Sequence, residues 1–150
     1  MEIEPLPPHK GCFGCGPDNL AGLQLRLVRE DSLTKAEFLP TQDYAGYEGL
    51  VHGGIVSLLF DEVMGTAAGY GKDLPCMSAE LTIRYVQPLP IDKKYILIGE
   101  VTADKHRLWL TRGEIRGEKG HLYAWATGKY LPLNKRKQKS LEEQLQIKLK

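Results

Sequence analysis

The sequence has no apolar run long enough to cross a membrane and too few cysteines for a disulfide framework. Its longest apolar stretch, residues 55–60, is interrupted by Ser57 and followed by Asp61 and Glu62, whereas a membrane span needs roughly 20 apolar residues. The three cysteines are an odd number and are better interpreted as thiols. The N-terminus, MEIEPLPPHK, contains acids and prolines where a signal peptide would have a basic start and an apolar run. These absences predict a cytoplasmic protein with no membrane partner.

The sequence also lacks an excess of charge of either sign. Twenty Lys and Arg residues oppose nineteen Asp and Glu residues, for a net charge of +1. An extended basic surface for nucleic acid is therefore not expected, and only segment 135–139 is locally basic. A length of 150 residues with 42% hydrophobic content is typical of one globular domain. We expect that domain over residues 1–133 and a charged helical tail over residues 134–150.

Alternating apolar residues predict a mainly antiparallel sheet. A hairpin is expected over residues 23–28 and 33–39, and a long helix begins at Gly54. Four further strands should follow the helix, over residues 77–87, 95–104, 107–116 and 121–131. One face of such a sheet must be covered, and this helix is the only sizeable cover. The fold class is therefore α+β, with two leading strands, a helix and four strands.

The helical segment has two different faces when about 100° is assigned to each residue. The bulky side, which should pack on the sheet, contains Val56, Leu59, Phe60, Val63, Ala67 and Tyr70. The opposite side contains mostly small residues, namely Gly54, Ser57, Asp61, Gly65 and Ala68. Small side chains leave room for a ligand or for another backbone. Asp61 lies in the middle of this small-residue face.

The residues His52-Gly53-Gly54 stand where the helix begins. A helix that starts with glycines presents unpaired N–H groups at the positive end of its dipole, as an oxyanion hole requires. Asp61 lies about two turns further along, so it cannot reach the same atom from its own helix, although a second copy could bring it there. The residues alone also allow plainer interpretations: Asp61 as a solvent-facing helix residue, and the glycines as backbone hinges.

The motif His52-Gly53-Gly54, with Asp61 nine positions after the histidine, resembles the phenylacetic-acid-degradation branch of hotdog-fold acyl-CoA thioesterases. The resemblance covers roughly residues 12–132. It includes the segment GLVHGGIVSLLFDEVMG, the strand order, and a serine, Ser78, seven residues before Tyr85. It implies a hotdog fold, in which the antiparallel sheet wraps around one long central helix. It also implies a homodimer or a dimer of dimers, with no cofactor and no metal.

The resemblance further implies hydrolysis of an acyl-CoA thioester to a free acid and CoA. The Gly53 N–H would hold the thioester carbonyl oxygen, and His52 would orient the acyl-sulfur end. Asp61 of the opposing copy would act as general base or as nucleophile, and Ser78 would help to hold the water. Some members carry Asn or Gln six residues before the histidine, where this chain has Gly46. The expected substrate-binding positions are Gly46, Gly54, Ser57 and Arg84.

Three other functions remain open from the sequence: an acyl-CoA sensor, a zinc-stabilised interaction module, and a dehydratase or hydratase on the same fold. The same fold could bind acyl-CoA as a sensor without hydrolysing it, because fold does not fix function. The motif Cys12-Phe13-Gly14-Cys15-Gly16 has the spacing of half a zinc site, but no second CxxC is present, so a plain turn is favoured. Cys76, His9 or a second copy would have to complete a metal site. Glu62 is interpreted as a structural residue or a supporting partner of the site.

Overall fold

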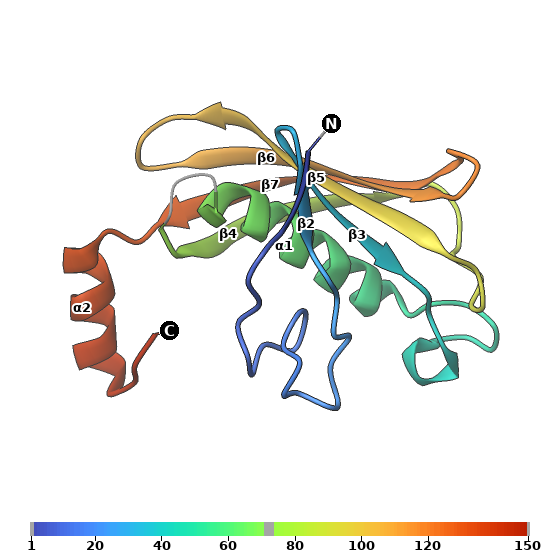
Figure 1. Ribbon diagram of the computed structural model, residues 1–150, viewed down its shortest axis with the longest axis horizontal. Helices are drawn as coiled ribbons and strands as arrows, with labels where there is room; N and C mark the ends of the chain where they lie inside the picture. The colour runs from blue at the N-terminus through green and yellow to red at the C-terminus, as the bar shows by residue number, and fades with distance from the viewer. Residues whose placement is uncertain (1, 71–73, 150) are drawn as a thin grey trace.

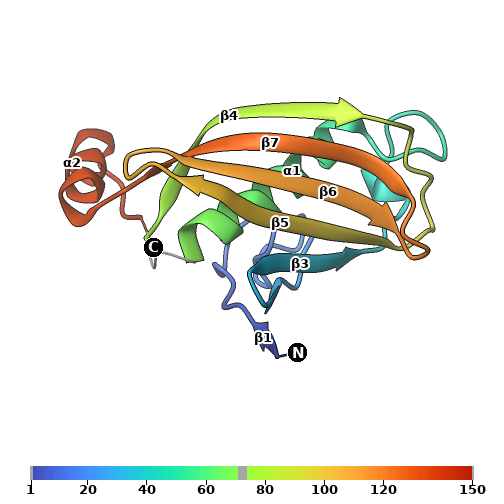
Figure 2. The same ribbon diagram turned by 90° about the horizontal axis from the view of Figure 1, so that it is seen from above.

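The structure is a computed structural model that describes residues 2–70 and 74–149. A seven-stranded antiparallel sheet, in the order β1-β2-β3-β5-β6-β7-β4, lies over the long helix α1, Gly53–Tyr70 (Figures 1 and 2). The strands are β1 Ile3–Pro5, β2 Val28–Glu30, β3 Leu33–Phe38, β4 Cys76–Tyr85, β5 Tyr95–Asp104, β6 Trp109–Gly117 and β7 Leu122–Pro132. This arrangement confirms the predicted α+β class, with a sheet wrapped around one central helix.

The leading hairpin is shorter than the sequence predicts. β2 and β3 pair antiparallel around Asp31, but β2 begins at Val28 rather than at Leu23. The alternation of leucines before it does predict burial, since Leu25 and Leu27 are both buried. However, Gln24 has φ 51°, outside the extended region, and the Leu25 N–H donates to Gly14 O in the N-terminal loop. The sequence also gave no sign of β1, which pairs with β2.

The bulky face of α1 packs on the sheet as predicted. Among its residues, Leu59, Phe60 and Val63 are fully buried. The approach is close because glycines stand on the facing strands: a Cβ at Gly99 would lie 2.5 Å from Val63 O, and one at Gly113 would lie 2.9 Å from Phe60 Cδ1. Gly99 and Gly113 are direct partners on β5 and β6. A larger side chain at either position would push the helix off the sheet.

An irregularity in β4 decides which of its residues face the helix. In a regular strand, residues seven apart point to opposite faces. The register of β4 against β7 shifts between Ser78 and Glu80, which is the signature of a β-bulge. Ser78 and Tyr85 consequently both reach α1, through Asp61 and Gly53 respectively. The bulge therefore brings the two ends of this strand to one side of the sheet.

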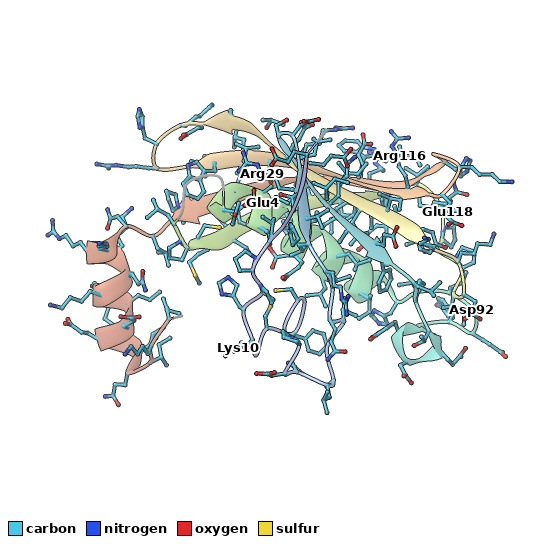
Figure 3. The ribbon with its side chains drawn as sticks, viewed as in Figure 1. Glu4, Lys10, Arg29, Asp92, Arg116 and Glu118 are labelled. Carbon is cyan, nitrogen blue, oxygen red and sulfur yellow. The ribbon has the colours of Figure 1, made fainter. Side chains whose placement is uncertain are left out.

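The outer face of the sheet, turned away from α1, carries charged side chains. Arg116 Nε donates to Glu114 Oε2 at 2.7 Å, and Arg112 Nη2 donates to Glu114 Oε1 at 3.3 Å. The Arg112 guanidinium also lies 4.9 Å from the centre of the Trp125 ring. Figure 3 shows Arg116 on this outer side. The two guanidinium groups hold the pKa of the Glu114 carboxyl below its ordinary value, against the opposing effect of burial.

The substitution Glu114→Gln is expected to remove a small, pH-dependent contribution to stability. Because the folded-state pKa lies below the unfolded value near 4.5, the contribution is present above that value and is lost as pH falls through the folded-state pKa. The pairs are partly exposed, so the expected contribution at neutral pH is about 0.2–1 kcal/mol. Urea unfolding of both proteins from neutral to acidic pH measures it. A difference between them that stays constant with pH would contradict this expectation.

The tail forms a separate helix, α2, Lys135–Leu145. The Asn134 side chain accepts a hydrogen bond from the Lys137 N–H at 2.8 Å and so caps its first turn. In both ribbon views α2 lies away from α1, beyond the end of β7 (Figures 1 and 2). Neither α1 nor α2 is long and apolar enough to cross a membrane.

Candidate active site

The carboxylate of Asp61 is held by hydroxyl groups from two strands. Ser78 Oγ on β4 donates to Asp61 Oδ1 at 2.6 Å, and Tyr130 OH on β7 donates to the same oxygen at 2.9 Å. The carboxylate is only half-buried, so one oxygen is fixed while the group keeps access to solvent. Hydrogen bonds to a charged acceptor are the stronger kind and also fix its orientation. This arrangement suits a carboxylate that must meet a reactant in one orientation.

Tyr130 is a site residue that the sequence analysis missed. Its side chain is buried, and burial raises the pKa of its phenol well above the ordinary range, with the Asp61 charge adding to the effect. The phenol therefore stays protonated and always donates. Tyr130 lies 69 residues from Asp61 in the sequence. The packing of α1 on β7 brings these two residues together, and the pairing of β4 with β7 places Ser78 opposite Tyr130.

His52 and the glycines after it form the N-terminus of α1. The Gly54 N–H donates to His52 Nδ1 at 2.8 Å, so the histidine caps its own helix and, when neutral, carries its proton on Nε2. The Gly54 N–H is thus used within the chain. For the Gly53 N–H, the described residues provide no acceptor. Gly53 is exposed and begins α1, so this N–H remains available to a ligand at the positive end of the helix dipole.

The end of β4 fixes the first turn of α1. Tyr85 OH donates to Gly53 O at 3.0 Å, and Ser57 Oγ lies 3.1 Å from Tyr85 OH and 3.3 Å from Gly53 O. Ser57 therefore lies on the same small-residue face as Asp61, one turn closer to the helix start. The structure brings Ser57 together with the helix N-terminus, and it adds Tyr85, whose contact the sequence analysis did not foresee.

Gly46 lies against His52, whereas Arg84 lies apart from the other predicted residues. A Cβ at Gly46 would be 3.2 Å from His52 Cα and from His52 Cδ2. An Asn or Gln at this position would require the histidine ring to shift. Arg84 follows Ile83 and precedes Tyr85, which face α1, so strand alternation directs it to the outer face. The structure does not bring Arg84 together with Asp61.

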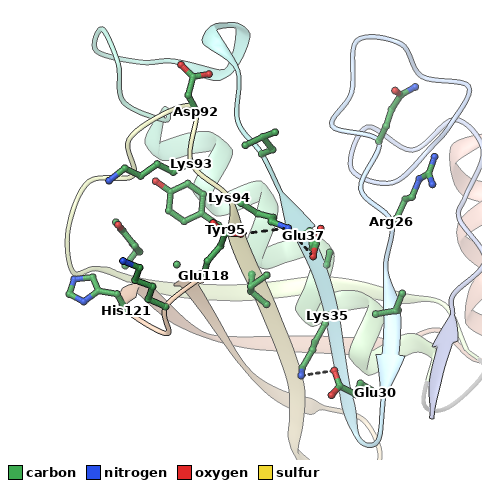
Figure 4. A pocket seen from close by; sticks show the side chains of 18 residues that line it. Arg26, Glu30, Lys35, Glu37, Asp92, Lys93, Lys94, Tyr95, Glu118 and His121 are labelled. Atoms are coloured by element: carbon green, nitrogen blue, oxygen red, sulfur yellow. Dashed lines mark hydrogen bonds and ion pairs between the residues drawn. The ribbon is translucent and has the colours of Figure 1, made fainter. Parts of the chain in front are cut away.

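A large open cleft lies elsewhere among the described residues. It has a volume of about 1370 Å³ and lies along β2, β3 and the beginning of β5 (Figure 4). Basic side chains line it, with Lys35 paired to Glu30 and Lys94 paired to Glu37. None of His52, Asp61 and Ser78 contributes to its lining. These three predicted residues therefore lie outside this cleft.

The cysteine-containing loop packs against a different side of α1. In Figure 1 the loop between β1 and β2 lies on the side of α1 away from the sheet. Cys12 Sγ lies 3.7 Å from both carboxylate oxygens of Glu62. Cys15 is buried, and burial together with the Glu62 carboxylate raises the pKa of its thiol well above the ordinary range. Asp61 and Glu62 are adjacent on α1 but have different surroundings. Asp61 contacts β4 and β7, whereas Glu62 contacts the cysteine-containing loop.

Comparison with known proteins identifies the family. The family model described as "Thioesterase superfamily" matches residues 48–124, which include α1 and most of the sheet that follows it. The match covers just over half of the chain, and the chain therefore belongs to the thioesterase superfamily. An uncharacterized protein of Schizosaccharomyces pombe is 31% identical over 81 residues, which are 52% of this chain and 45% of that protein. The chain thus spans less than half of the length of this curated relative.

Solved structures share the fold. A crystal structure of a thioesterase superfamily protein has 29% identity and a TM-score of 0.76, covering 81% of this chain and 60% of that one. A thioesterase from Haemophilus influenzae has 13% identity and a TM-score of 0.72, with 80% and 85% covered. A hypothetical thioesterase from Streptococcus pneumoniae, solved with coenzyme A, has 18% identity and a TM-score of 0.64, with 69% and 82% covered. All of these agree with a hotdog arrangement of sheet and helix.

Proposed function

We propose that this protein hydrolyses acyl-CoA thioesters to a free acid and CoA, as a member of the phenylacetic-acid-degradation branch. The observation that carries the proposal is the half-buried Asp61 carboxylate, held by Ser78 and Tyr130 on the small-residue face of α1. Membership of the thioesterase superfamily supports the reaction type. The presence of coenzyme A in the similar structure from Streptococcus pneumoniae supports acyl-CoA as the substrate class.

The active site requires two copies of the chain. Asp61 and Gly53 are eight residues apart on one helix, or about 12 Å at 1.5 Å per residue, too far to act on one carbonyl group. In a two-fold dimer with antiparallel α1 helices, each Gly53 N–H faces the partner's Asp61. Among the described residues, β4 pairs along one edge only, with β7, and most of its residues are exposed, which supports this contact. An unpaired strand edge of this length is a ready surface for pairing with a second copy.

The reaction follows from these positions. The Gly53 N–H donates to the thioester carbonyl oxygen and stabilises the negative charge that forms there. Asp61 of the opposing copy accepts a proton from a water molecule, which attacks the carbonyl carbon and displaces the CoA thiolate. Ser78 and Tyr130 keep the Asp61 carboxylate in place, and the His52 ring supports the helix start through Gly54. Direct attack by the carboxylate would use the same geometry.

The substitution Ser78→Ala is expected to lower kcat by about 10–100-fold with little change in KM. It removes one hydrogen bond to a charged group, which is worth about 1.5–3 kcal/mol, while Tyr130 continues to hold the carboxylate. Ser78 is exposed, so the fold should tolerate alanine. Steady-state kinetics on the best substrate measure the effect. Unchanged kcat would show that the Ser78 contact has no part in the reaction.

A panel of short-chain, long-chain and aryl acyl-CoA substrates tests the proposal as a whole. Released CoA thiol is trapped with a chromogenic disulfide, and binding of each acyl-CoA is measured in parallel by calorimetry. Turnover of at least one member, far above the rate without protein, is expected. Tight binding without release of thiol from any member would contradict hydrolysis and would favour an acyl-CoA sensor.

A further inference from the structure

The N-terminal loop and α1 bring two thiols and a carboxylate together outside the candidate active site. The ligand atoms of Cys12, Cys15 and Glu62 all lie within 4.8 Å of one another. The Cys15 side chain is 5% exposed, and Cys12 and Glu62 are half-buried. A tetrahedral zinc ion with Zn–S bonds near 2.3 Å places two sulfur atoms about 3.8 Å apart. The cluster thus needs a contraction of only about 1 Å to enclose such an ion.

The loop has the shape of a ligand-presenting turn. The Gly14 N–H donates to Cys12 Sγ at 3.3 Å, which fixes the position of this sulfur atom within the turn. The Gly16 N–H donates to Cys12 O at 2.8 Å and closes the turn. A Cβ at Gly14 would collide with the Glu62 carboxylate, and a Cβ at Gly16 would collide with the Cys12 backbone. Glycine at position 14 lets the turn contact the Glu62 carboxylate, and glycine at position 16 lets the turn close against the Cys12 backbone.

The charge balance of the cluster favours a cation. Glu62 is partly buried, and within residues 2–70 and 74–149 its hydrogen bonds are to the thiols of Cys12 and Cys15, with no ion pair to a Lys or Arg side chain. Removing a carboxylate from water without a positive partner is costly. A disulfide between Cys12 and Cys15 would remove the thiol donors, and the Glu62 carboxylate would lose these hydrogen bonds. A divalent cation instead interacts favourably with all three groups.

We propose that Cys12, Cys15 and Glu62 bind a thiophilic divalent cation, Zn²⁺ above all, that ties the N-terminal loop to α1. Two sulfur ligands and one carboxylate oxygen suit zinc and cobalt rather than magnesium or calcium. Three protein ligands would leave the fourth position of the tetrahedron to water, unlike closed zinc sites with four protein ligands. The expected role is structural, because the loop lies on the side of α1 away from the sheet while Asp61 contacts β4 and β7. The inference does not depend on thioester hydrolysis.

Cobalt titration of the reduced, full-length chain tests the site. We expect one Co²⁺ per chain, with thiolate-to-cobalt charge-transfer absorption and displacement by Zn²⁺. Cys12→Ser and Glu62→Gln should each weaken binding by at least about tenfold. Cys76→Ser is the matched control: this third thiol donates to Gly65 O at 3.6 Å, outside the cluster. It should bind cobalt as the original chain does.

Thermal unfolding with and without Zn²⁺ distinguishes loss of the metal site from misfolding of a variant. Bound zinc should raise the midpoint of the original chain and of Cys76→Ser, and should leave that of Cys12→Ser unchanged. Cys12 is chosen because it is half-buried, whereas Cys15 is more deeply buried. Failure of the reduced chain to bind cobalt would overturn the proposal. Equal binding by Glu62→Gln would also overturn it.

Discussion

The variant Asp61→Asn should lose acyl-CoA turnover by about 10²–10⁴-fold, the range that a general base contributes. The amide has nearly the same shape and can still accept hydrogen bonds from Ser78 and Tyr130, so the helix and its surroundings should persist. It cannot take a proton from water at neutral pH. The loss should therefore appear in kcat, with KM changed much less. Steady-state release of CoA thiol measures both constants.

A second carboxylate provides the control for Asp61. Glu80 lies on β4, is exposed, and pairs with Lys129 on the adjacent strand. Glu80→Gln also removes one negative charge near the site and should leave turnover within about twofold, because exposed pairs contribute little. Asp61→Asn with turnover equal to that of Glu80→Gln would show that Asp61 is not the working group. A lowered thermal midpoint would show a folding defect instead.

Phe60→Ala should reduce the free energy of unfolding by about 3–5 kcal/mol, the typical cost of removing a buried aromatic side chain. Phe60 is fully buried and packs where Gly113 leaves space on β6. Alanine would leave a cavity that the facing glycine cannot fill. Since a domain is stable by only about 5–15 kcal/mol, a large fraction of the protein's stability is at stake. Urea unfolding followed by tryptophan fluorescence gives the value.

An exposed aromatic residue is the control for Phe60. Tyr47 is 86% exposed, so Tyr47→Ala should change the free energy of unfolding by no more than about 0.5 kcal/mol. A loss below about 1 kcal/mol in Phe60→Ala would mean that α1 is not packed on the sheet as described. The helix carries both Gly53 and Asp61. Its packing on the sheet is therefore a condition of the proposed site.

Period-two and helical patterns were sufficient for most of the fold. They predicted the bulky face of α1 and placed β5 at its observed bounds, because burial on one face selects apolar residues at a fixed spacing. They failed in the N-terminal region, where hydrogen bonds of Leu23 and Leu25 to the residues 13–14 loop replace a strand ladder. The bulge in β4 was also missed, since pairing with β7 is what shows the extra residue.

The candidate site was only partly accessible from the sequence. His52, Gly53 and Asp61 lie within ten residues of one another, so their spacing can be read directly from the sequence. Their expected catalytic roles came from the resemblance to a known family. Contacts between distant segments leave no local pattern: Tyr130 is 69 residues from Asp61, and Cys12 is 50 residues from Glu62. The cysteines alone therefore favoured a plain turn with no metal. The position of Glu62 beside them is the new fact behind the zinc proposal.

Mixing two inactive variants tests the shared active site most directly. Gly53→Pro removes the helix N-terminal N–H while keeping a residue that helix starts accept, and Tyr85 leaves 3.8 Å of space for the new Cβ. Each variant alone, Gly53→Pro or Asp61→Asn, should be nearly inactive. When both are coexpressed with different tags, half of the dimers are mixed and hold one intact site of two. The expected activity is then about a quarter of the original. Verified mixed dimers without recovered turnover would contradict a site built from Gly53 of one copy and Asp61 of the other.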